Sequence, residues 1–188
     1  MSATAQSENP ITEKVTIRRI STSETLPLRS SVLWPGAPLW RIQVPDDDHP
    51  TTAHYGAFIP GVEDAIAIIS LFIDDIPEGE PVDGPPKSTA DVQGTDTQHG
   101  PPIASIPIAR FRKFACDPRY QGQGVGTKLL KHVFDAARSD MGAKTIWCSA
   151  RVETQPWYEK RGMRAFGDTW LKADLLYVKM RIDLKSLN

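Results

Sequence analysis

Cys116-Asp117-Pro118-Arg119-Tyr120-Gln121-Gly122-Gln123-Gly124-Val125-Gly126-Thr127 is the stretch that decides the fold. A strand pattern ends at Cys116, and a helix pattern begins at Val125. Apolar residues alternate over 109–116, which predicts a strand. Apolar residues then recur every three to four positions over 125–138, which predicts an amphipathic helix that stops near Gly142. In a glycine-rich turn of this kind, backbone N–H groups can converge on a phosphate. We therefore predict a site for a pyrophosphate-bearing cofactor, with a purely structural tight loop as the alternative.

Two familiar phosphate-binding motifs fit this turn badly. A P-loop ends in Gly-Lys-Ser/Thr, whereas Thr127 here precedes Lys128. A dinucleotide-binding fingerprint has the spacing Gly-x-Gly-x-x-Gly directly after the strand. The glycines here are spaced Gly-x-Gly-x-Gly, and Asp-Pro-Arg-Tyr-Gln separates them from the strand. Neither motif is favoured.

A third pattern does fit. Gln121 to Gly126 match Gln-x-x-Gly-x-Gly, and with the preceding Phe114-Ala115-Cys116-Asp117-Pro118 they strongly resemble the acyl-CoA-binding motif of the GNAT superfamily of N-acyltransferases. A second block, Ala150-Arg151 followed by residues 156–163, looks like the family's Phe-Tyr-x-x-x-Gly-Phe signature. Trp157 replaces the first Phe of that signature and Met163 the last. The resemblance covers residues 105–183 well and the N-terminal half loosely.

The resemblance implies an α+β fold: a six- to seven-stranded, mostly antiparallel sheet with helices on both faces and a central strand pair that splays apart. It implies an N-acetyltransferase that moves the acetyl group of acetyl-CoA, its acyl-donor substrate, by direct attack of a primary amine on a small molecule or protein. The cofactor-binding residues it implies are Phe114, Ala115, Cys116, Gln121, Gly122, Gln123, Gly124, Val125, Gly126, Thr127 and Lys160.

The resemblance also assigns catalytic roles. Tyr158 is the expected general acid, because a phenol with a pKa near 10 is well matched to a departing alkyl thiolate. A helix tyrosine with its hydroxyl at the surface is the alternative. The backbone N–H of Phe114 is expected to face the thioester oxygen as a single-donor oxyanion hole. The general base stays open between Glu153, His54, Asp64 and a water molecule.

Two further classes of function remain open. One is a non-catalytic acyl-CoA-binding or sensing domain, which would tolerate loss of Tyr158. The other is a protein lysine or N-terminal acetyltransferase, whose basic target an acidic segment would attract. Ser149 stands where related sequences often carry Asn or His, so the contacts to the acceptor are also open.

Charge is distributed unevenly along the chain. Residues 1–104 contain 6 basic and 15 acidic residues, and residues 105–188 contain 16 basic and 8 acidic ones, so the net charge of −1 hides a basic half. That half contains the proposed phosphate site, where positive charge would attract coenzyme A. The basic residues nearest in sequence, which form a solvated face in the alternative interpretation, are Arg119, Lys128, Lys131 and Lys160. They are spread out and form no nucleic-acid-binding motif, so no nucleic acid partner is expected.

Length and composition favour a single domain. A chain of 188 residues with 40% hydrophobic residues can bury one sizeable core. We expect the domain to span residues 13–188 and to follow a disordered polar tail, residues 1–12. Residues 74–104 contain six prolines, four glycines and seven acidic residues. That composition predicts a flexible insertion between two paired strands, either passive or acting as an acidic flap.

The N-terminal half is expected to complete the sheet. Residues 15–20 read as a strand, and Ser21 or Ser23 caps a helix with Pro27 in its first turn. The acidic residues 46–48 read as a loop. Residues 53–59 and 65–73 then form a hairpin around Pro60-Gly61, and the continuous apolar run 65–69 predicts burial on both faces of its second strand.

Location and partners follow from what the sequence lacks. No apolar run approaches the roughly 20 residues of a membrane span, and the N-terminus lacks the apolar core of a signal peptide. Cys116 and Cys148 are expected to be reduced core residues, and the four histidines are too scattered for a metal site. We expect a cytoplasmic or nuclear monomer or homodimer without metal or membrane contact.

Overall fold

The computed structural model describes residues 11–77 and 106–186, which form a seven-stranded sheet in the order β1-β2-β3-β4-β5-β7-β6. Every neighbouring pair of strands is antiparallel except β4 and β5, which are parallel. The predicted mostly antiparallel sheet is therefore confirmed. Its strands are β1 (Thr16–Ile20), β2 (Ala53–Phe58), β3 (Ala67–Ile73), β4 (Ile108–Cys116), β5 (Thr145–Arg151), β6 (Arg164–Lys172) and β7 (Leu175–Asp183).

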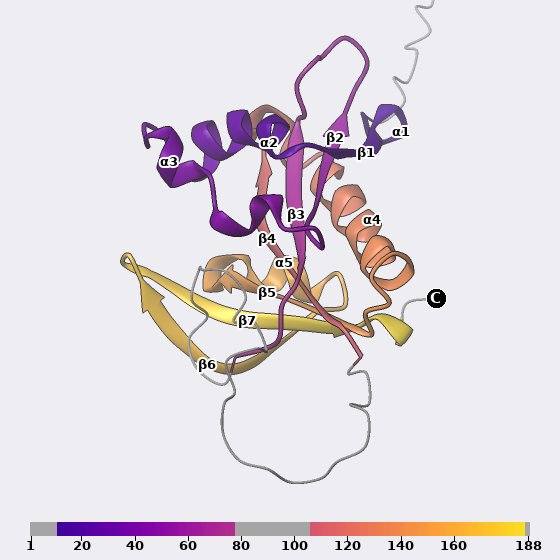
Figure 1. Cartoon of the computed structure of the whole chain (residues 1–188), viewed down its shortest axis with the longest axis vertical. Coiled ribbons are helices and arrows are strands. Elements are labelled where there is room, and N and C mark those ends of the chain that lie inside the picture. The colour runs from indigo at the N-terminus through magenta and orange to yellow at the C-terminus, as the bar shows by residue number, and fades with distance from the viewer. Residues whose placement is uncertain (1–10, 78–105, 187–188) are drawn as a thin grey trace, which may run out of the picture.

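Helices cover both faces of this sheet, as expected. Figure 1 shows α2 (Thr22–Leu28) and α3 (Leu39–Ile42) on one side of β2–β4 and α4 (Val125–Ser139) on the other. The short α1 (Ile11–Lys14) contacts α4, and α5 (Gln155–Glu159) follows β5. No helix in these two described ranges has the length and apolar character that crossing a membrane requires.

The hydrophobic core lies mainly between α4 and the sheet. Val125, Leu129, Val133 and Ala137 recur every four residues on one side of α4, and all four are fully buried against the strands. The helix ends at Ser139, and Gly142 follows with a φ of +66°, a left-handed conformation that glycine adopts without a Cβ penalty. The periodicity in the sequence thus predicted this helix and its end correctly.

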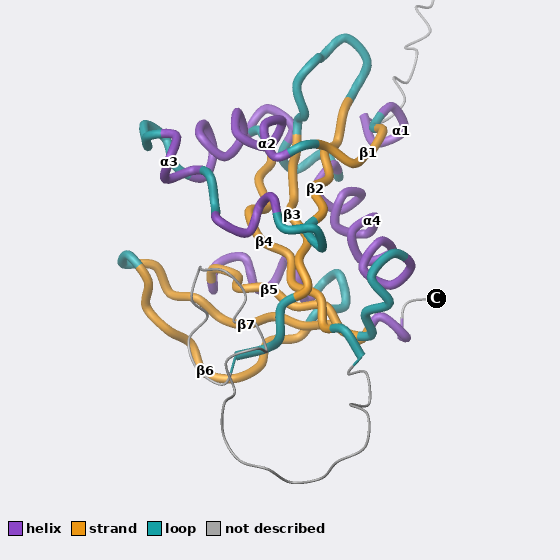
Figure 2. Tube along the Cα trace, viewed as in Figure 1, coloured by secondary structure: helices purple, strands orange, loops and turns teal. Residues whose placement is uncertain are grey.

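The hairpin in the N-terminal half also forms as predicted. β2 and β3 pair antiparallel, and the loop between them is drawn in teal in Figure 2. Ile68 packs on the α2 side with Ile20, Leu28 and Ala115, whereas Ile69 belongs to the core on the α4 side. The continuous apolar run therefore does mark a strand that is buried on both faces.

The first long helix differs from its prediction. Ser21 caps α2, because its side chain accepts a hydrogen bond from the N–H of Glu24 while the Glu24 carboxylate accepts from the N–H of Ser21. Pro27 is the sixth residue of α2, not part of its first turn. A proline at this depth lacks the N–H that would continue the hydrogen-bond ladder. The α-helix ends one residue later, and the chain continues as a π-helical turn, Arg29–Leu33.

The N-terminal boundary also differs from its prediction. Ile11 and Thr12, placed in the disordered tail, belong to α1, and residues 1–10 lie outside the described residues. The Lys128 ammonium donates to the carbonyls of Thr12 (2.8 Å) and Val15 (2.7 Å). Lys128 therefore fastens the start of the domain to α4, and its charge is not directed at the predicted phosphate site.

The acidic insertion starts in an ordered way. The carboxylate of Asp74 pairs with Arg110 at 2.8 Å, and its carbonyl accepts from the indole N–H of Trp147 at 2.8 Å. The carbonyl of Pro77 accepts from the Lys179 ammonium at 3.2 Å. Residues 74–77 are therefore fixed against the sheet, and the other residues of the predicted insertion lie outside the described part of the chain, between β3 and β4.

The three consecutive aspartates do not form the solvated loop that was expected. Residues 45–48, called the aspartate turn below, make one 3₁₀ turn that buries Asp46 and Asp47. Asp46 pairs with Arg112 of β4, and Asp47 receives two hydrogen bonds from the fully buried Arg29. Burial alone would raise the pKa of Asp47, but hydrogen bonds from Arg29 and the Val44 N–H outweigh it and hold the pKa below its ordinary value.

His54 completes the buried polar network around Arg29. Its Nε2 lies 3.0 Å from the Asp47 carbonyl oxygen, which can only accept, so Nε2 carries the proton. Its Nδ1 lies 2.8 Å from the Ser70 hydroxyl, which donates to it while accepting from Arg29. Burial lowers the pKa of His54, although the adjacent Asp47 opposes this, and the imidazole is neutral at pH 7.

Replacing Asp47 by Asn should destabilise the protein strongly, because it leaves the buried Arg29 guanidinium without its counter-charge. The expected loss in the free energy of unfolding is about 3–5 kcal/mol, measured by urea denaturation. Asp135→Asn is the matched control: Asp135 pairs with Arg138 on the surface, with about half of each side chain exposed, so the change should be within measurement error. Equal effects of the two substitutions would contradict the structural role of the aspartate turn.

Acidification should destabilise the protein through His54. Because its pKa is lowered in the folded state, the unfolded chain binds a proton that the folded chain does not bind, so the free energy of unfolding falls as the pH drops below about 6.5. The slope from this one group approaches about 1.4 kcal/mol per pH unit. Thermal or urea unfolding between pH 7.5 and 5.5 measures it. His54→Gln should flatten this slope, whereas substitution of the exposed His49 by Gln should leave it in place.

Candidate active site

The central strands separate, as the resemblance implied. β4 and β5 pair only at Ile108–Thr145, Ala109–Ile146 and Arg110–Trp147. Beyond these pairs, β4 continues to Cys116 beside β3, and β5 continues to Arg151 beside β7. The two strands therefore leave a wedge-shaped opening between their carboxyl ends.

A β-bulge lies at the edge of this opening. Arg112 pairs with Ser70 and Ala115 with Ile68, so the two residues Lys113 and Phe114 oppose a single residue of β3. Lys113 has a φ of +55°, a left-handed conformation that is unfavourable for a residue with a side chain. The bulge turns the backbone of Phe114 out of the regular ladder where β4 and β5 part.

A cleft of about 580 Å³ occupies the opening, and its volume lies in the range of small-molecule sites. β4, β5, β6, β7, the π-helical turn and α5 all contribute to its lining. Five of the residues predicted for the site line this cleft: Phe114, Ala115, Cys116, Gln121 and Tyr158.

The glycine turn leads from the end of β4 into α4. Gly122 and Gly124 have φ angles of +74° and +83°, and Gly124 caps α4. The first helical hydrogen bond runs from the Lys128 N–H to the Gly124 carbonyl at 3.0 Å, so the N–H groups of residues 125–127 have no acceptor in the helix. A Cβ at Gly124 would lie 2.7 Å from the Thr12 Cγ2, and one at Gly126 would lie 3.3 Å from the Phe114 ring. Glycine is therefore needed here for close approach as well as for backbone conformation.

Polar side chains brace the turn from within. Gln121 donates to the Cys116 carbonyl at 2.9 Å, and Gln123 donates to the Arg119 carbonyl at 2.7 Å. The Arg119 guanidinium is bound to Asp117 at 2.6 Å. The expected free positive charge at Arg119 is therefore balanced by its neighbour.

A cation that the sequence analysis missed lies close to the turn. Arg161 donates to the Thr127 hydroxyl through Nε (3.0 Å) and a terminal nitrogen (2.5 Å), and its guanidinium stacks 3.5 Å from the centre of the Trp157 ring. Lys160, the residue predicted for this role, is exposed. The signal that identifies Arg161 is its position four residues after Trp157, which puts both on one side of a helical turn.

Tyr158 is buried between aromatic rings, so a surface tyrosine is excluded. Its ring centre lies 5.9 Å from that of Phe111 and 5.0 Å from that of Trp157. Burial raises its pKa well above the ordinary value of 10.0, with a smaller contribution from Cys148. Its hydroxyl is therefore protonated at neutral pH.

Both thiols near the cleft are neutral as well. Burial, followed by the charge of Asp117, raises the pKa of Cys116 to about 11. Burial raises the pKa of Cys148 further. Because the nucleophile in thiol chemistry is the thiolate, neither cysteine is activated to accept an acyl group.

The three candidates for a side-chain base do not line the cleft. His54 is committed to the network around Arg29, and Asp64 is exposed in the loop between β2 and β3. Glu153 is exposed in the 3₁₀ turn Val152–Thr154. The structure thus places none of the three candidates in the cleft, and the described lining of the cleft contains no Asp, Glu or His.

Two tryptophans, Trp34 and Trp170, line the cleft. Trp147 is fully buried in the protein, whereas Trp40 is 76% exposed.

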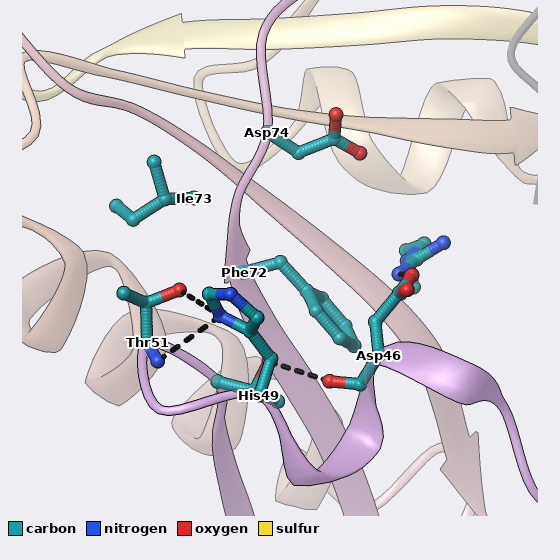
Figure 3. A pocket seen from close by; sticks show the side chains of 8 residues that line it. Asp46, His49, Thr51, Phe72, Ile73 and Asp74 are labelled. Carbon is teal, nitrogen blue, oxygen red and sulfur yellow. Dashed lines mark hydrogen bonds and ion pairs between the residues drawn. The ribbon is translucent and has the colours of Figure 1, made fainter. Parts of the chain in front are cut away.

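A second hollow lies beside the aspartate turn. Figure 3 shows Asp46, His49 and Thr51 from one segment and Phe72, Ile73 and Asp74 from the end of β3 around it. Its volume of about 10 Å³ is room for about one water molecule, so it is no substrate site. Within residues 11–77 and 106–186, no group of three or more His, Cys, Asp or Glu side chains could hold a metal ion.

Comparisons with known proteins agree with this geometry. Residues 104–184 match the family model of the acetyltransferase (GNAT) domain. A search of curated protein sequences found no significant match.

Solved structures show the same fold at low sequence identity. Escherichia coli ElaA is 14% identical, with a TM-score of 0.62 over 89% of this chain and 98% of that one. An acyl-CoA N-acyltransferase from Pseudomonas aeruginosa is 18% identical, with a TM-score of 0.56 over 89% and 97%. A chimera of the spermidine N-acetyltransferase SpeG from Vibrio cholerae with hSSAT is 13% identical, with a TM-score of 0.60 over 93% and 99%.

The matched domain spans β4 to β7 and contains both the glycine turn and Tyr158. Residues 104–184 therefore match the GNAT acetyltransferase domain family, and the chain shares the fold of solved acyl-CoA N-acyltransferases.

Proposed function

We propose that the protein transfers the acetyl group of acetyl-CoA to a primary amine by direct attack. The observation that carries this proposal is the cleft between the parted ends of β4 and β5, because Phe114 of the bulge, Gln121 just before the glycines of the turn, and Tyr158 all line it. A phosphate-binding turn, a thioester-binding backbone and a proton donor are the three groups that such a transfer needs.

The donor would bind from the α4 side. The N–H groups of Val125, Gly126 and Thr127 would hold the pyrophosphate at the positive end of the α4 dipole, with the Arg161 guanidinium next to Thr127. Gly122, Gln123 and Gly124 would let the phosphates approach the backbone closely. Phe114, Ala115, Cys116 and Gln121 would line the pantetheine arm, and Lys160 would be an outer contact to a phosphate.

The chemistry then follows from the positions of two groups. The neutral amine attacks the thioester carbon, so that a C–N bond forms and the C–S bond breaks. The Phe114 N–H would stabilise the oxyanion, and the protonated Tyr158 would give its proton to the departing thiolate. Water would take the proton that the amine loses. The neutral state of Cys116 and Cys148 supports direct transfer over an acyl-cysteine intermediate.

Two other functions predict different behaviour. A sensing domain would bind acetyl-CoA but would neither turn it over nor depend on Tyr158. A protein acetyltransferase with a basic target would need acidic side chains at the acceptor site. The described lining of the cleft contains none, which favours a small acceptor.

Tyr158→Phe should lower kcat by about 10²-fold or more and leave the KM for acetyl-CoA unchanged, because only the proton donor is lost. Steady-state assays of thiol release measure both constants. Tyr55→Phe is the matched control, since Tyr55 is a buried tyrosine on β2 outside the cleft. Because burial raises the pKa of Tyr158, its hydroxyl should stay protonated up to pH 10. Deprotonation of Tyr158 should therefore cause no decrease in the kcat of the wild type up to that pH. Unchanged kcat in Tyr158→Phe would remove Tyr158 from the mechanism.

Gln123→Glu should weaken acetyl-CoA binding about tenfold, because it adds a negative charge beside the pyrophosphate site. Calorimetric titration with acetyl-CoA measures the dissociation constant. Gln43→Glu makes the same change of charge at an exposed position outside the cleft and should leave the affinity unchanged. A folded wild-type protein that does not bind acetyl-CoA would contradict the proposed function itself.

A further inference from the structure

We propose that the acceptor is a small amine that also carries a carboxylate, in the manner of an amino acid with an apolar side chain. We place it on the α2 side of the sheet, with its carboxylate bound by Arg151. This inference rests on the acetyl transfer proposed above and names the class of its acceptor.

The register of the sheet shows which side chains share that side. Ser149 and Arg151 of β5 lie opposite Lys179 and Tyr177 of β7, and Tyr177 lies opposite Trp170 of β6. Directly opposite residues in a sheet point to the same face. Cys148 and Ala150 alternate with them on β5 and belong to the core on the α4 side. Arg151, Tyr177 and Trp170 therefore face the side opposite α4.

The two substrates would thus approach from opposite sides. The glycine turn begins α4, so the phosphates of the donor belong to the α4 side. The π-helical turn contributes Val32 and Leu33 to the cleft from the α2 side, and Trp34 follows directly after the turn. An acceptor that entered there would meet the thioester between the parted strands without crossing the donor.

The charge of the cleft indicates the charge of this acceptor. Among the described residues that line the cleft none is acidic, and five are cationic: Arg110, Arg112, Lys113, Arg151 and Lys172. Arg110 and Arg112 pair with Asp74 and Asp46, which commits much of their charge. Arg151 is exposed at the end of β5, and its side chain makes no hydrogen bond or ion pair with the described residues. An arginine fork suits a carboxylate, whereas a polyamine or a lysine-rich peptide would be repelled.

Aromatic rings in the cleft indicate what kind of side chain the acceptor carries. Trp170 and Tyr177 stack with ring centres 5.8 Å apart and an angle of 25° between the planes. Trp34 lines the opposite wall, with the Lys113 ammonium 4.8 Å from its ring centre. These rings provide apolar surface next to the cations, so an apolar or aromatic side chain beside the carboxylate would be bound best.

Matched pairs of amines test this inference directly. Acetylation of tryptophan, phenylalanine and methionine is compared with that of tryptamine, phenethylamine and 3-(methylthio)propylamine, which lack only the carboxylate; spermidine is included as a polycation. The expected result is a kcat/KM at least tenfold higher for the carboxylate member of a pair, decreasing with added salt. Higher values for the amines without a carboxylate, or no acetylation of any amino acid, would overturn the inference.

A variant with a matched control assigns the carboxylate to its proposed partner. Arg151→Gln should raise the KM for the amino acid about tenfold, the effect of losing one charge-assisted hydrogen bond, and leave the KM for its decarboxylated partner unchanged. Lys144→Gln, the same change of charge just before the other end of β5, should change neither constant. Equal effects of Arg151→Gln on both members of a pair would overturn the assignment.

Acetyl-CoA binding separates this inference from the function on which it rests. Calorimetry on each variant should give the wild-type dissociation constant for acetyl-CoA. If the protein binds and turns over acetyl-CoA without preference for a carboxylate, only the inference about the acceptor is wrong. If the folded protein does not bind acetyl-CoA, the proposed function is wrong as well.

Discussion

The parting of β4 and β5 after three paired residues is the constraint on which the rest of this structure depends. Two adjacent strands that diverge expose peptide groups and open the core, and both effects cost free energy unless something compensates. β4 keeps its bonds to β3 and β5 keeps its bonds to β7, so each strand remains paired on one side. The opening survives because the surrounding sheet is continuous, and Tyr158 with its aromatic neighbours limits its depth.

The aspartate turn supports the other side of this opening. It binds Arg112, which belongs to β4 just before the bulge, and Arg29, which begins the π-helical turn that lines the cleft. Buried ion pairs contribute little net stability compared with apolar packing, but they penalise any arrangement that separates them. We interpret the two pairs as setting the distance between the π-helical turn and β4, and so the width of the cleft at its acceptor side.

Features with a local signal could be predicted from the sequence. The apolar spacing of α4, its end near Gly142 and the hairpin around Pro60-Gly61 depend on residues a few positions apart, and all formed as predicted. Of the predicted site residues, Gln121 at the start of the glycine motif and Tyr158 line one cleft, because both belong to motifs with a fixed place on strand and helix.

Features that depend on distant partners could not be predicted. Three consecutive aspartates have the local pattern of a solvated loop, and only Arg29 and Arg112, far away in the sequence, make them a buried turn. Lys128 was expected near the phosphate site because it lies close to the glycine turn in sequence. Its actual partners, the carbonyls of Thr12 and Val15, are more than 100 residues away along the chain. The grouping of Arg151, Tyr177 and Trp170 on one face depends on register across three strands, which no single segment of sequence contains.

Contact between the start of the domain and the glycine turn has a consequence for how this protein can change in evolution. The methyl group of Thr12 occupies the space into which a side chain at position 124 would extend, and Lys128 holds the same segment in place. A residue other than glycine at position 124 would thus require both a tolerated left-handed backbone and a displaced α1. Positions 12 and 124 are therefore expected to vary together among homologues, and in proteins in which α1 is missing or moved only the left-handed backbone still favours glycine.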